Sequence, residues 1–309
     1  MNVLDFFVNS YSHLKNYGMP YWVMAPARRV VRTLAHKHLP KYLVRPVAKS
    51  TAICEDLIVS FTSFPARIQE VWQVVECMKR QSLLPHKIIL WLSKDQFPDI
   101  KSVPQSLWNR VDDLFCIRFI EGDIMSHKKY YYVSNEYPNK LIFLIDDDIY
   151  YDTDILSRSV REYNKHEKCV VCNYGYQIKF NNKGCLSYSK WKVVEENRIG
   201  KDLFFGSGGG TLFRPSDFYK DLTRIELALS LTPVADDIWL NTMSLKSELT
   251  KVMLPHGPIL TIDIKKNRTL SSVNNGCGRN DEQIQAVRQY YGDVFNYPHD
   301  SDNILVNND

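Results

Sequence analysis

The sequence predicts an α/β protein built around a covered, largely parallel sheet. From residue 56 onward, short apolar segments rich in β-formers alternate with segments whose apolar residues recur at helical spacing. The run Leu141–Ile145 is apolar throughout, as expected for a central strand with helices on both faces. Strands separated by helices form βαβ units with parallel strands, and such sheets bind ligands beyond the carboxyl ends of their strands.

The individual elements can be placed by composition and spacing. The expected strands are 57–61, 87–92, 115–120, 141–145, 170–180 and 203–213. The expected helices are 68–78, 127–136, 153–166, 236–248 and 281–291. Proline residues punctuate the pattern, and Pro138 closes the helix that precedes the central strand.

Composition and charge exclude several classes of protein. With 44% hydrophobic and 24% charged residues, the chain has the composition of a globular protein. Its net charge of +4 is unevenly distributed. Residues 1–50 carry eight Lys and Arg against one acid, whereas the rest of the chain carries 31 bases and 34 acids. A body so close to neutral argues against nucleic-acid binding.

The basic N-terminal region, residues 1–50, admits two interpretations. It has no run of about 20 apolar residues that could span a bilayer, and it lacks the order of a signal peptide. Its mixture of aromatic and basic residues suits an anionic membrane surface. The alternative is a helical appendage that packs on the body. The seven irregularly spaced cysteines indicate free thiols in a reducing cytoplasm, so we expect a cytoplasmic protein, peripheral at the inner face of the membrane in the first interpretation.

Three adjacent acids follow the central strand directly. Asp146, Asp147 and Asp148 repel one another, so their placement costs stability unless a cation neutralises them. Carboxylates are hard ligands suited to Mg²⁺ or Mn²⁺, which are commonly shared with substrate phosphates. The plain alternative is a solvated turn that caps the next helix. A phosphatase aspartate is disfavoured because residues 149–151 offer no small hydroxyl residue or glycine.

A glycine-rich strand and a second acidic pair lie further along the chain. Residues 206–211 read Gly-Ser-Gly-Gly-Gly-Thr, and glycines inside a strand mark a bulge or the close approach of a ligand. The segment has neither the Walker nor the Rossmann spacing. Asp236 and Asp237 open a helical run, where they could act as a helix cap or supply a general base.

Together, the strand ending in acids, the glycine-rich strand and the later acidic pair resemble the GT-A glycosyltransferases. The last two features look like the β-1,3-galactosyltransferase and fringe group, whereas Asp236-Asp237-Ile238-x-x-Asn241 is equally similar to the exostosin-like transferases. Segments 60–67 and 127–130 look like those of bacterial transferases that build capsules and O-antigens. The resemblance covers residues 56–260 and implies a GT-A-like, Rossmann-type nucleotide-binding fold with a mixed central sheet.

The resemblance also implies a site. Donor-binding residues would be Thr62, Ser63, Pro65, Arg67, Lys128, Lys129, Asp146, Asp147, Gly208, Gly209 and Gly210. Mn²⁺ or Mg²⁺ would be held by Asp148, with Asp146 and His256. The catalytic base would be Asp237, with Asp236 as its substitute.

The function implied is transfer of a hexose or N-acetylhexosamine from a nucleotide-diphosphate donor, a UDP-sugar, to a hydroxyl of a glycan or lipid-linked saccharide. We expect inversion with Asp237 as base, in surface polysaccharide synthesis, by a catalytic domain over 51–296 with a polar tail over 297–309. Two alternatives remain open: a retaining transferase of the exostosin-like type, and a non-catalytic glycan- or nucleotide-binding protein on the same fold.

Overall fold

The computed structural model describes residues 2–14, 20–46, 50–182, 184–254, 257–262 and 278–295. The helices are α1 (Val3–Ser12), α2 (Tyr21–Leu43), α3 (Trp72–Lys79), α4 (Gln105–Trp108), α5 (Lys128–Glu136), α6 (Ile155–Tyr163), α7 (Ile225–Leu231), α8 (Asp236–Lys246) and α10 (Arg279–Tyr291). The strands are β1 (Ile53–Thr62), β2 (Leu84–Ser93), β3 (Phe115–Ile120), β4 (Leu141–Ile145), β5 (Cys169–Cys172), β6 (Gly175–Gln177), β7 (Phe180–Asn181), β8 (Gly184–Cys185), β9 (Lys192–Val193), β10 (Arg198–Gly200), β11 (Leu203–Phe205), β12 (Gly209–Phe213) and β13 (Thr250–Met253).

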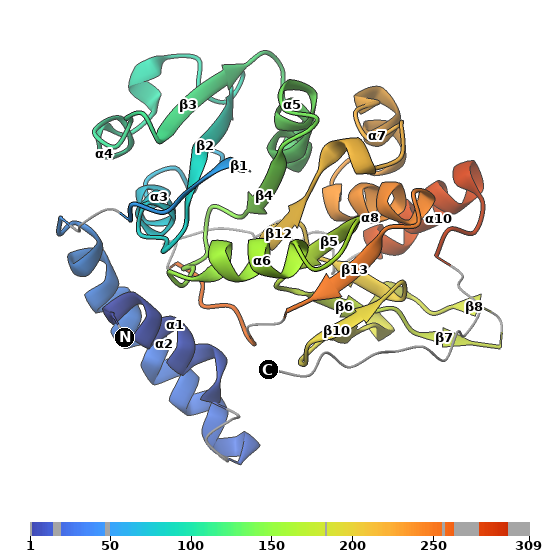
Figure 1. Ribbon diagram of the computed structural model, residues 1–309, viewed down its shortest axis with the longest axis horizontal. Helices are drawn as coiled ribbons and strands as arrows, with labels where there is room; N and C mark the ends of the chain where they lie inside the picture. Colours follow the sequence, from blue (N-terminus) through green and yellow to red (C-terminus); the bar gives the residue numbers. More distant parts are fainter. Residues whose placement is uncertain are drawn as a thin grey trace.

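The predicted α/β class and mixed central sheet are confirmed. The main sheet has the strand order β10-β13-β5-β12-β4-β1-β2-β3 (Figure 1). Strands β3, β2, β1 and β4 run parallel, so their carboxyl ends lie at one edge. Strand β12 runs antiparallel to β4 and pairs Gly209 with Ile145. The amino end of β12 therefore lies beside the carboxyl end of β4.

Helices cover both faces of this sheet, as the apolar central strand predicted. All five residues of β4 are buried. Leu141, Phe143 and Ile145 pack in one core cluster with side chains of α3 and α6. Ile142 and Leu144 pack in a second cluster with side chains of α5 and α8. The alternation follows from the strand geometry, which points successive side chains to opposite faces.

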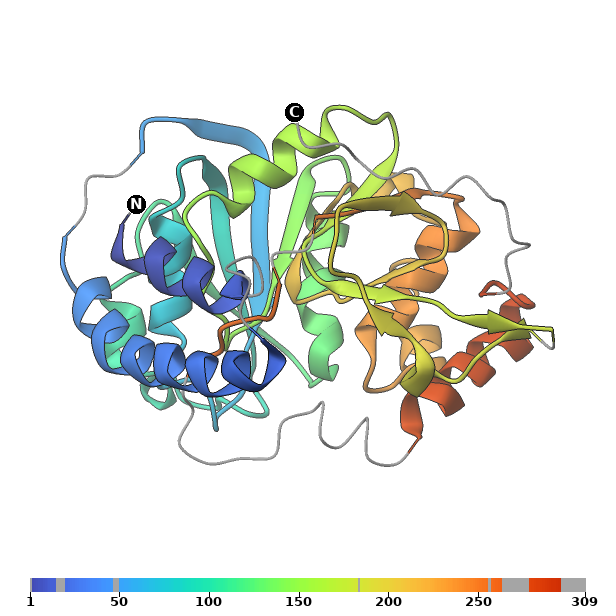
Figure 2. The same cartoon turned by 90° about the horizontal axis from the view of Figure 1, so that it is seen from below.

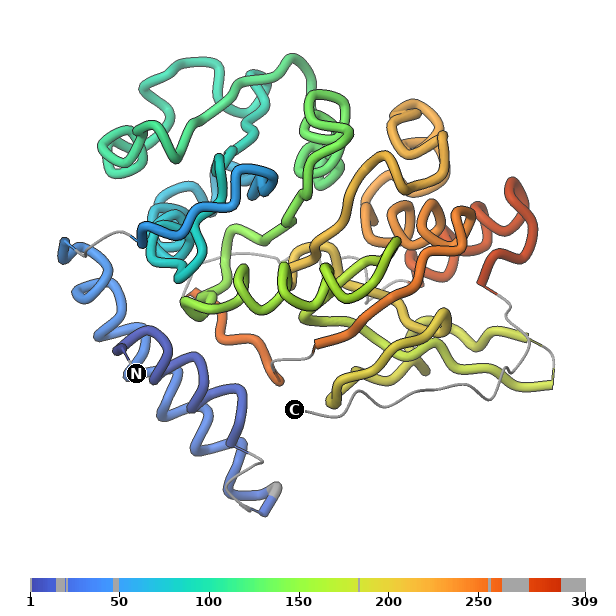
Figure 3. The backbone as a smooth tube through the Cα atoms, viewed as in Figure 1, coloured from blue at the N-terminus to red at the C-terminus, as the bar shows by residue number. Residues whose placement is uncertain are grey.

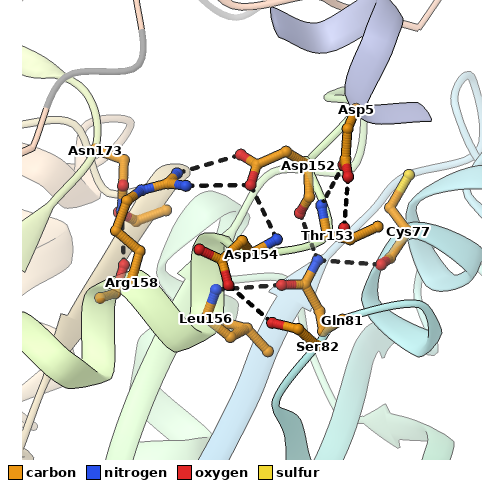
Figure 4. Close-up of polar contacts among 12 residues, drawn as sticks. Asp5, Cys77, Gln81, Ser82, Asp152, Thr153, Asp154, Leu156, Arg158 and Asn173 are labelled. Carbon is orange, nitrogen blue, oxygen red and sulfur yellow. Dashed lines mark hydrogen bonds and ion pairs between the residues drawn. The ribbon is translucent and has the colours of Figure 1, made fainter. Parts of the chain in front are cut away.

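The two N-terminal helices pack against the body. Leu4 and Leu39 are fully buried in the core cluster that contains α3. The side chain of Asp5 accepts hydrogen bonds from the backbone N–H and the hydroxyl of Thr153, at 2.8 and 2.7 Å (Figure 4). His36 Nε2 lies 2.8 Å from the carbonyl oxygen of Thr261. In Figure 3, this blue helical pair lies at the opposite side of the molecule from the red helix α10. The described residues of the N-terminal region therefore form a helical appendage that packs on the body.

The outward side of α2 keeps apolar and basic side chains in solvent. Trp22 is 77% exposed and Val30 is 58% exposed, and Arg29, Arg32 and Lys37 are exposed beside them. Among the helices in the described part of the chain, none combines the length and apolar character needed to cross a bilayer.

Two predicted strands are each divided between sheets, which corrects their expected bounds. The expected strand 170–180 is β5 in the main sheet and β6 in a three-stranded sheet with the order β11-β6-β9. The expected strand 203–213 is likewise divided into β11 and β12. The two breaks face each other, because the backbone N–H of Gly206, between β11 and β12, donates to the carbonyl of Tyr174, between β5 and β6, at 3.0 Å. Figure 2 shows the small sheet beside the main one.

Candidate active site

Four elements converge on one cavity at the sheet edge. The carboxyl ends of β1 and β4, the amino end of β12 and the start of α8 surround a volume of about 650 Å³. The backbone N–H of Asp146 donates to the carbonyl of Gly208 at 2.9 Å, which joins the acidic cluster to the glycine-rich segment. The predicted site residues that line the cavity are Thr62, Ser63, Arg67, Lys128, Lys129, Asp146, Asp147, Asp148, Gly208, Gly209, Asp236 and Asp237.

Two predicted residues lie outside the cavity lining, and a third is not described. Pro65 is exposed in the turn after β1 and is outside the cavity lining. Gly210 faces the core, since a Cβ atom there would lie 3.0 Å from Ile155 and from Phe143. His256 lies outside the described residues.

The three adjacent aspartates have different environments. Asp147 is buried and accepts hydrogen bonds from Ser63 Oγ at 2.5 Å and from Arg67 Nη1 at 2.7 Å. Burial raises the pKa of Asp147, although Arg67 and Ser63 oppose the rise. Arg67 also reaches Asp148 at 2.9 Å. The carboxylate of Asp147 is thus occupied by Ser63 and Arg67. The side chains of Asp146 and Asp148, in contrast, are 41% and 18% exposed.

Lys129 connects the two acidic groups that the sequence places far apart. Its Nζ atom lies 3.0 Å from Asp146 Oδ1 and 3.3 Å from Asp236 Oδ2, and only 7% of the side chain is exposed. Burial lowers the pKa of Lys129, but the charges of Asp146 and Asp236 outweigh burial, so the pKa is raised and the ammonium group stays charged. Lys128, its neighbour, forms an ion pair with Asp123 instead.

The two carboxyl groups at the start of α8 differ: Asp236 is ionised, whereas Asp237 is readily protonated. Asp236 accepts a hydrogen bond from Ser207 at 2.6 Å. Burial would raise its pKa, but Lys129 outweighs burial, and the net shift is downward. Burial, reinforced by the charge of Asp236, raises the pKa of Asp237 to about 7. A carboxyl with a pKa near 7 can accept a proton from a reacting group at neutral pH.

In the structure, neither Asp236 nor Asp237 is the N-cap residue of α8. Helix α8 begins at Asp236, so its N-cap residue is Ala235, which has no side-chain capping hydrogen bond. Asp237 Oδ1 accepts only a local bond from the N–H of Ile238, at 2.9 Å. The carboxyl of Asp237 also lines the cavity. Its position therefore leaves it accessible to a ligand.

The charge balance of the cavity fits a divalent cation. Among the lining residues that the structure describes, five aspartates face Arg67, Lys128 and Lys129, and Lys128 is already paired. A diphosphate would add negative charge to this surplus. Burial and the charge of Asp146 raise the pKa of Asp148 to about 7, even though Arg67 opposes the rise, so this cluster carries more negative charge than its own cations balance.

The ligand set also suits a shared metal ion. Within the described ranges, no group of three or more His, Cys, Asp or Glu side chains is placed to hold a metal by itself. Mg²⁺-like ions, however, are typically bound by one or two carboxylates together with substrate phosphates and water. Asp146 and Asp148, the two aspartates of the cluster with exposed carboxylates, fit that mode of binding.

Several residues that support or line the cavity were not anticipated from the sequence. Tyr151 donates a hydrogen bond to the carbonyl of Gly208 at 2.6 Å and accepts one from the N–H of Asp146 at 2.8 Å, so it fixes the start of the acidic cluster. Three tyrosines, Tyr174, Tyr176 and Tyr188, line the cavity itself. The glycine-rich segment was the only sequence signal near them, and it does not identify its neighbours across the sheets.

Comparison with known proteins finds solved structures that are similar to this chain in fold. The chain matches no protein-family model, and none of the curated proteins compared with it matches either. It is similar to a mannosyltransferase from Pyrobaculum calidifontis solved with GDP-Man and Mn²⁺, at 12% identity and a TM-score of 0.43 over 94% of this chain and 76% of that one. It is also similar to a UDP-glucose pyrophosphorylase from Acinetobacter baumannii, at 11% identity and a TM-score of 0.42 over 76% and 93% of the two chains. Likeness at this level does not carry function to this chain.

Proposed function

We propose that the protein transfers a hexose or N-acetylhexosamine from a nucleotide-diphosphate donor, a UDP-sugar, to a hydroxyl of a glycan or lipid-linked saccharide. One observation carries the proposal. Lys129 lies between Asp146, in the acidic cluster, and Asp236, beside Asp237, so a cation-binding edge and a basic carboxyl share one cavity. Such an arrangement suits a reaction in which a diphosphate leaves and a hydroxyl attacks.

The donor would occupy the end of the cavity formed by β1 and β4. Thr62 ends β1 and Ser63 follows it, where the base and ribose would lie. Asp146 and Asp148 would hold Mn²⁺ or Mg²⁺, which supplies positive charge for the diphosphate. Arg67 is fixed by two aspartates and keeps its own positive charge at this end. Lys129 adds a second buried cation.

Asp237 would act on the acceptor. Its carboxylate takes the proton of the acceptor hydroxyl while the hydroxyl oxygen bonds to the anomeric carbon of the sugar, and the bond from that carbon to the diphosphate oxygen breaks. The nucleoside diphosphate leaves with the bonding electron pair. Attack from the side opposite the leaving group inverts the anomeric centre. Burial and the charge of Asp236 raise the pKa of Asp237, and Lys129 limits the rise, so the pKa is about 7.

Release of nucleoside diphosphate from a panel of UDP- and GDP-hexoses tests this proposal. With Mn²⁺ the parent protein should release nucleoside diphosphate slowly to water and faster with an accepted glycan, and EDTA should stop both. Asp237→Asn should bind the donor but lose the accelerated release. Binding without release by the parent would identify a non-catalytic nucleotide-sugar protein, and a retained anomer in the product would remove Asp237 as the base of an inverting reaction.

A further inference from the structure

The cavity has an aromatic wall that the donor chemistry does not use. We define this tyrosine wall as Tyr174, Tyr176 and Tyr188, all half-buried and all lining the cavity. The rings of Tyr174 and Tyr176 meet edge to face with centroids 5.6 Å apart, and their hydroxyls are 2.9 Å apart. The ring of Tyr188 follows at 5.5 Å from Tyr176. The three rings form one continuous surface.

Buried aromatic side chains hold this wall in place. Trp191, with a centroid 4.9 Å from that of Tyr188, and Phe204, at 5.7 Å, pack behind it. Both are buried. The backbone N–H of Tyr188 donates to Asp281 Oδ1 at 2.7 Å, which ties the turn carrying Tyr188 to the start of α10. A surface fixed in this way loses little conformational entropy when a ligand binds.

The wall lies at the Asp237 end of the cavity. Tyr176 and Tyr188 pack against the core cluster that contains Ala235 and Ile238, the residues on either side of the acidic pair Asp236–Asp237. Gly209 lets the wall approach the glycine-rich segment, because a Cβ atom at this position would lie 2.4 Å from the Cβ atom of Tyr174. Arg67, in contrast, is paired with Asp147 and Asp148 at the end where the diphosphate would bind.

We propose that the tyrosine wall is the acceptor subsite and that it binds an uncharged pyranose ring through the C–H face of the ring. The inference rests on the proposed function and names the substrate class for the second half of the cavity. Sugar C–H groups carry small positive partial charges, which complement the negative faces of aromatic rings, and tyrosine hydroxyls can hydrogen-bond to the ring hydroxyls. A ring held on the wall would present a hydroxyl to Asp237.

The test is saturation-transfer NMR with methyl β-glucopyranoside, methyl β-galactopyranoside and methyl N-acetyl-β-glucosaminide, in the presence of UDP and Mn²⁺. At least one probe should receive saturation on its ring C–H protons. Tyr188→Leu and Tyr176→Leu should weaken its binding about tenfold, since they remove the stacking contact. Tyr188→Phe keeps the ring and should remain within about threefold of the parent. Tyr290→Leu, on the exposed surface of α10, is the matched control and should bind as the parent does.

The affinity for UDP with Mn²⁺, measured by calorimetry on the same variants, separates the outcomes. Unchanged UDP affinity with weakened pyranoside binding supports the inference and shows that the Leu variants fold. A parallel loss of UDP affinity in Tyr188→Leu and Tyr188→Phe would assign the wall to the donor base. A parent that binds UDP but none of the pyranosides would overturn the inference alone, whereas a parent that binds pyranosides but no nucleotide sugar would overturn the proposed function and leave the wall intact.

Discussion

Gly208 lies so close to Asp146 that a Cβ atom on residue 208 would be 1.8 Å from the carboxyl carbon of Asp146. The backbone carbonyl of the same glycine accepts the N–H of Asp146 at 2.9 Å. The glycine is therefore required by contact with the acidic cluster, and its φ angle is not among the positive ones. The first carboxylate of the cluster has its present position because no side chain stands at residue 208.

Gly208→Ala should displace the Asp146 carboxylate and weaken Mn²⁺-dependent binding of a UDP-sugar at least about tenfold, or ~1.4 kcal/mol. Calorimetry on parent and variant measures the effect. Gly122→Ala is the control, because Gly122 has a φ of +70° and open space around it. That control should lose about 1 kcal/mol of stability through backbone strain and keep its donor affinity. Equal donor affinity in Gly208→Ala and the parent would show that Asp146 does not contact the donor complex.

Asp237→Asn should abolish the rise of the transfer rate with pH. Asp237 is surrounded by Asp236, Lys129, Asp146 and Tyr188, and its pKa of about 7 predicts a parental rate that increases up to about pH 7 and then levels. The variant should turn over roughly 10²–10⁴-fold more slowly.

The same substitution has a defined effect on stability. The folded-state pKa of Asp237 is raised, so its contribution to stability is present at low pH and lost as the pH rises through about 7. Asparagine does not ionise, so the Asp237→Asn variant avoids this loss. Its free energy of unfolding at pH 8 should therefore be no lower than that of the parent. A variant that transfers at the parental rate, with the parental pH profile, would contradict the assignment of the base.

Lys251 predicts a pH-dependent stability unrelated to catalysis. It is fully buried in β13, donates to the carbonyl of Leu203 at 2.7 Å, and lies near Cys172 and Asp202. Burial lowers its pKa to about 7. The folded state therefore loses stability as the pH falls towards 7, by roughly 1.4 kcal/mol per pH unit. Denaturant unfolding between pH 7 and 9 should show this slope in the parent and lose it in Lys251→Met; identical slopes in the two proteins would show that Lys251 is charged in the fold.

The N-terminal helices should serve folding and membrane attachment through different faces. Deleting residues 2–45 removes Leu4 and Leu39 from the core and should lower the melting temperature. Replacing Arg29, Arg32 and Lys37 with Gln changes only exposed side chains and should keep the melting temperature. Co-sedimentation with phosphatidylserine-containing vesicles should fall in the Gln variant, since each basic residue near an anionic surface contributes about 1 kcal/mol. Equal sedimentation of parent and variant would leave the helices with a packing role alone.

The parts of the fold predictable from sequence were those with local signals. Strands 115–120 and 141–145 have their predicted bounds. The second is a continuous apolar run that is buried throughout, and the first is rich in residues that favour strands. The division of 203–213 between two sheets was not predictable, since it depends on hydrogen-bond partners such as Tyr174 that are distant in the sequence. Of the 25 residues that line the cavity, 12 were predicted as site residues, and these include all of its aspartates.

The sequence could not distinguish the three adjacent aspartates from one another. Their different roles depend on Ser63 and Arg67, which occupy Asp147 and leave the carboxylates of Asp146 and Asp148 partly exposed. The tyrosine wall was missed for the same reason. Tyr174 precedes β6, Tyr176 lies in it and Tyr188 begins a later 3-10 turn, and their spacing in the sequence does not identify a site.

The central claim is that Asp146 and Asp148 bind a divalent cation together with the diphosphate of a nucleotide sugar. A thermal-shift titration of UDP-sugars with and without Mn²⁺, on the parent and on Asp148→Asn, tests it directly. The account predicts that the parent is stabilised only when metal and nucleotide sugar are both present, by about 2.7 kcal/mol at a hundredfold excess over Kd. Asp148→Asn should fold but show no such synergy. Equal stabilisation of both proteins, or stabilisation of the parent by nucleotide sugar with EDTA, would contradict the claim.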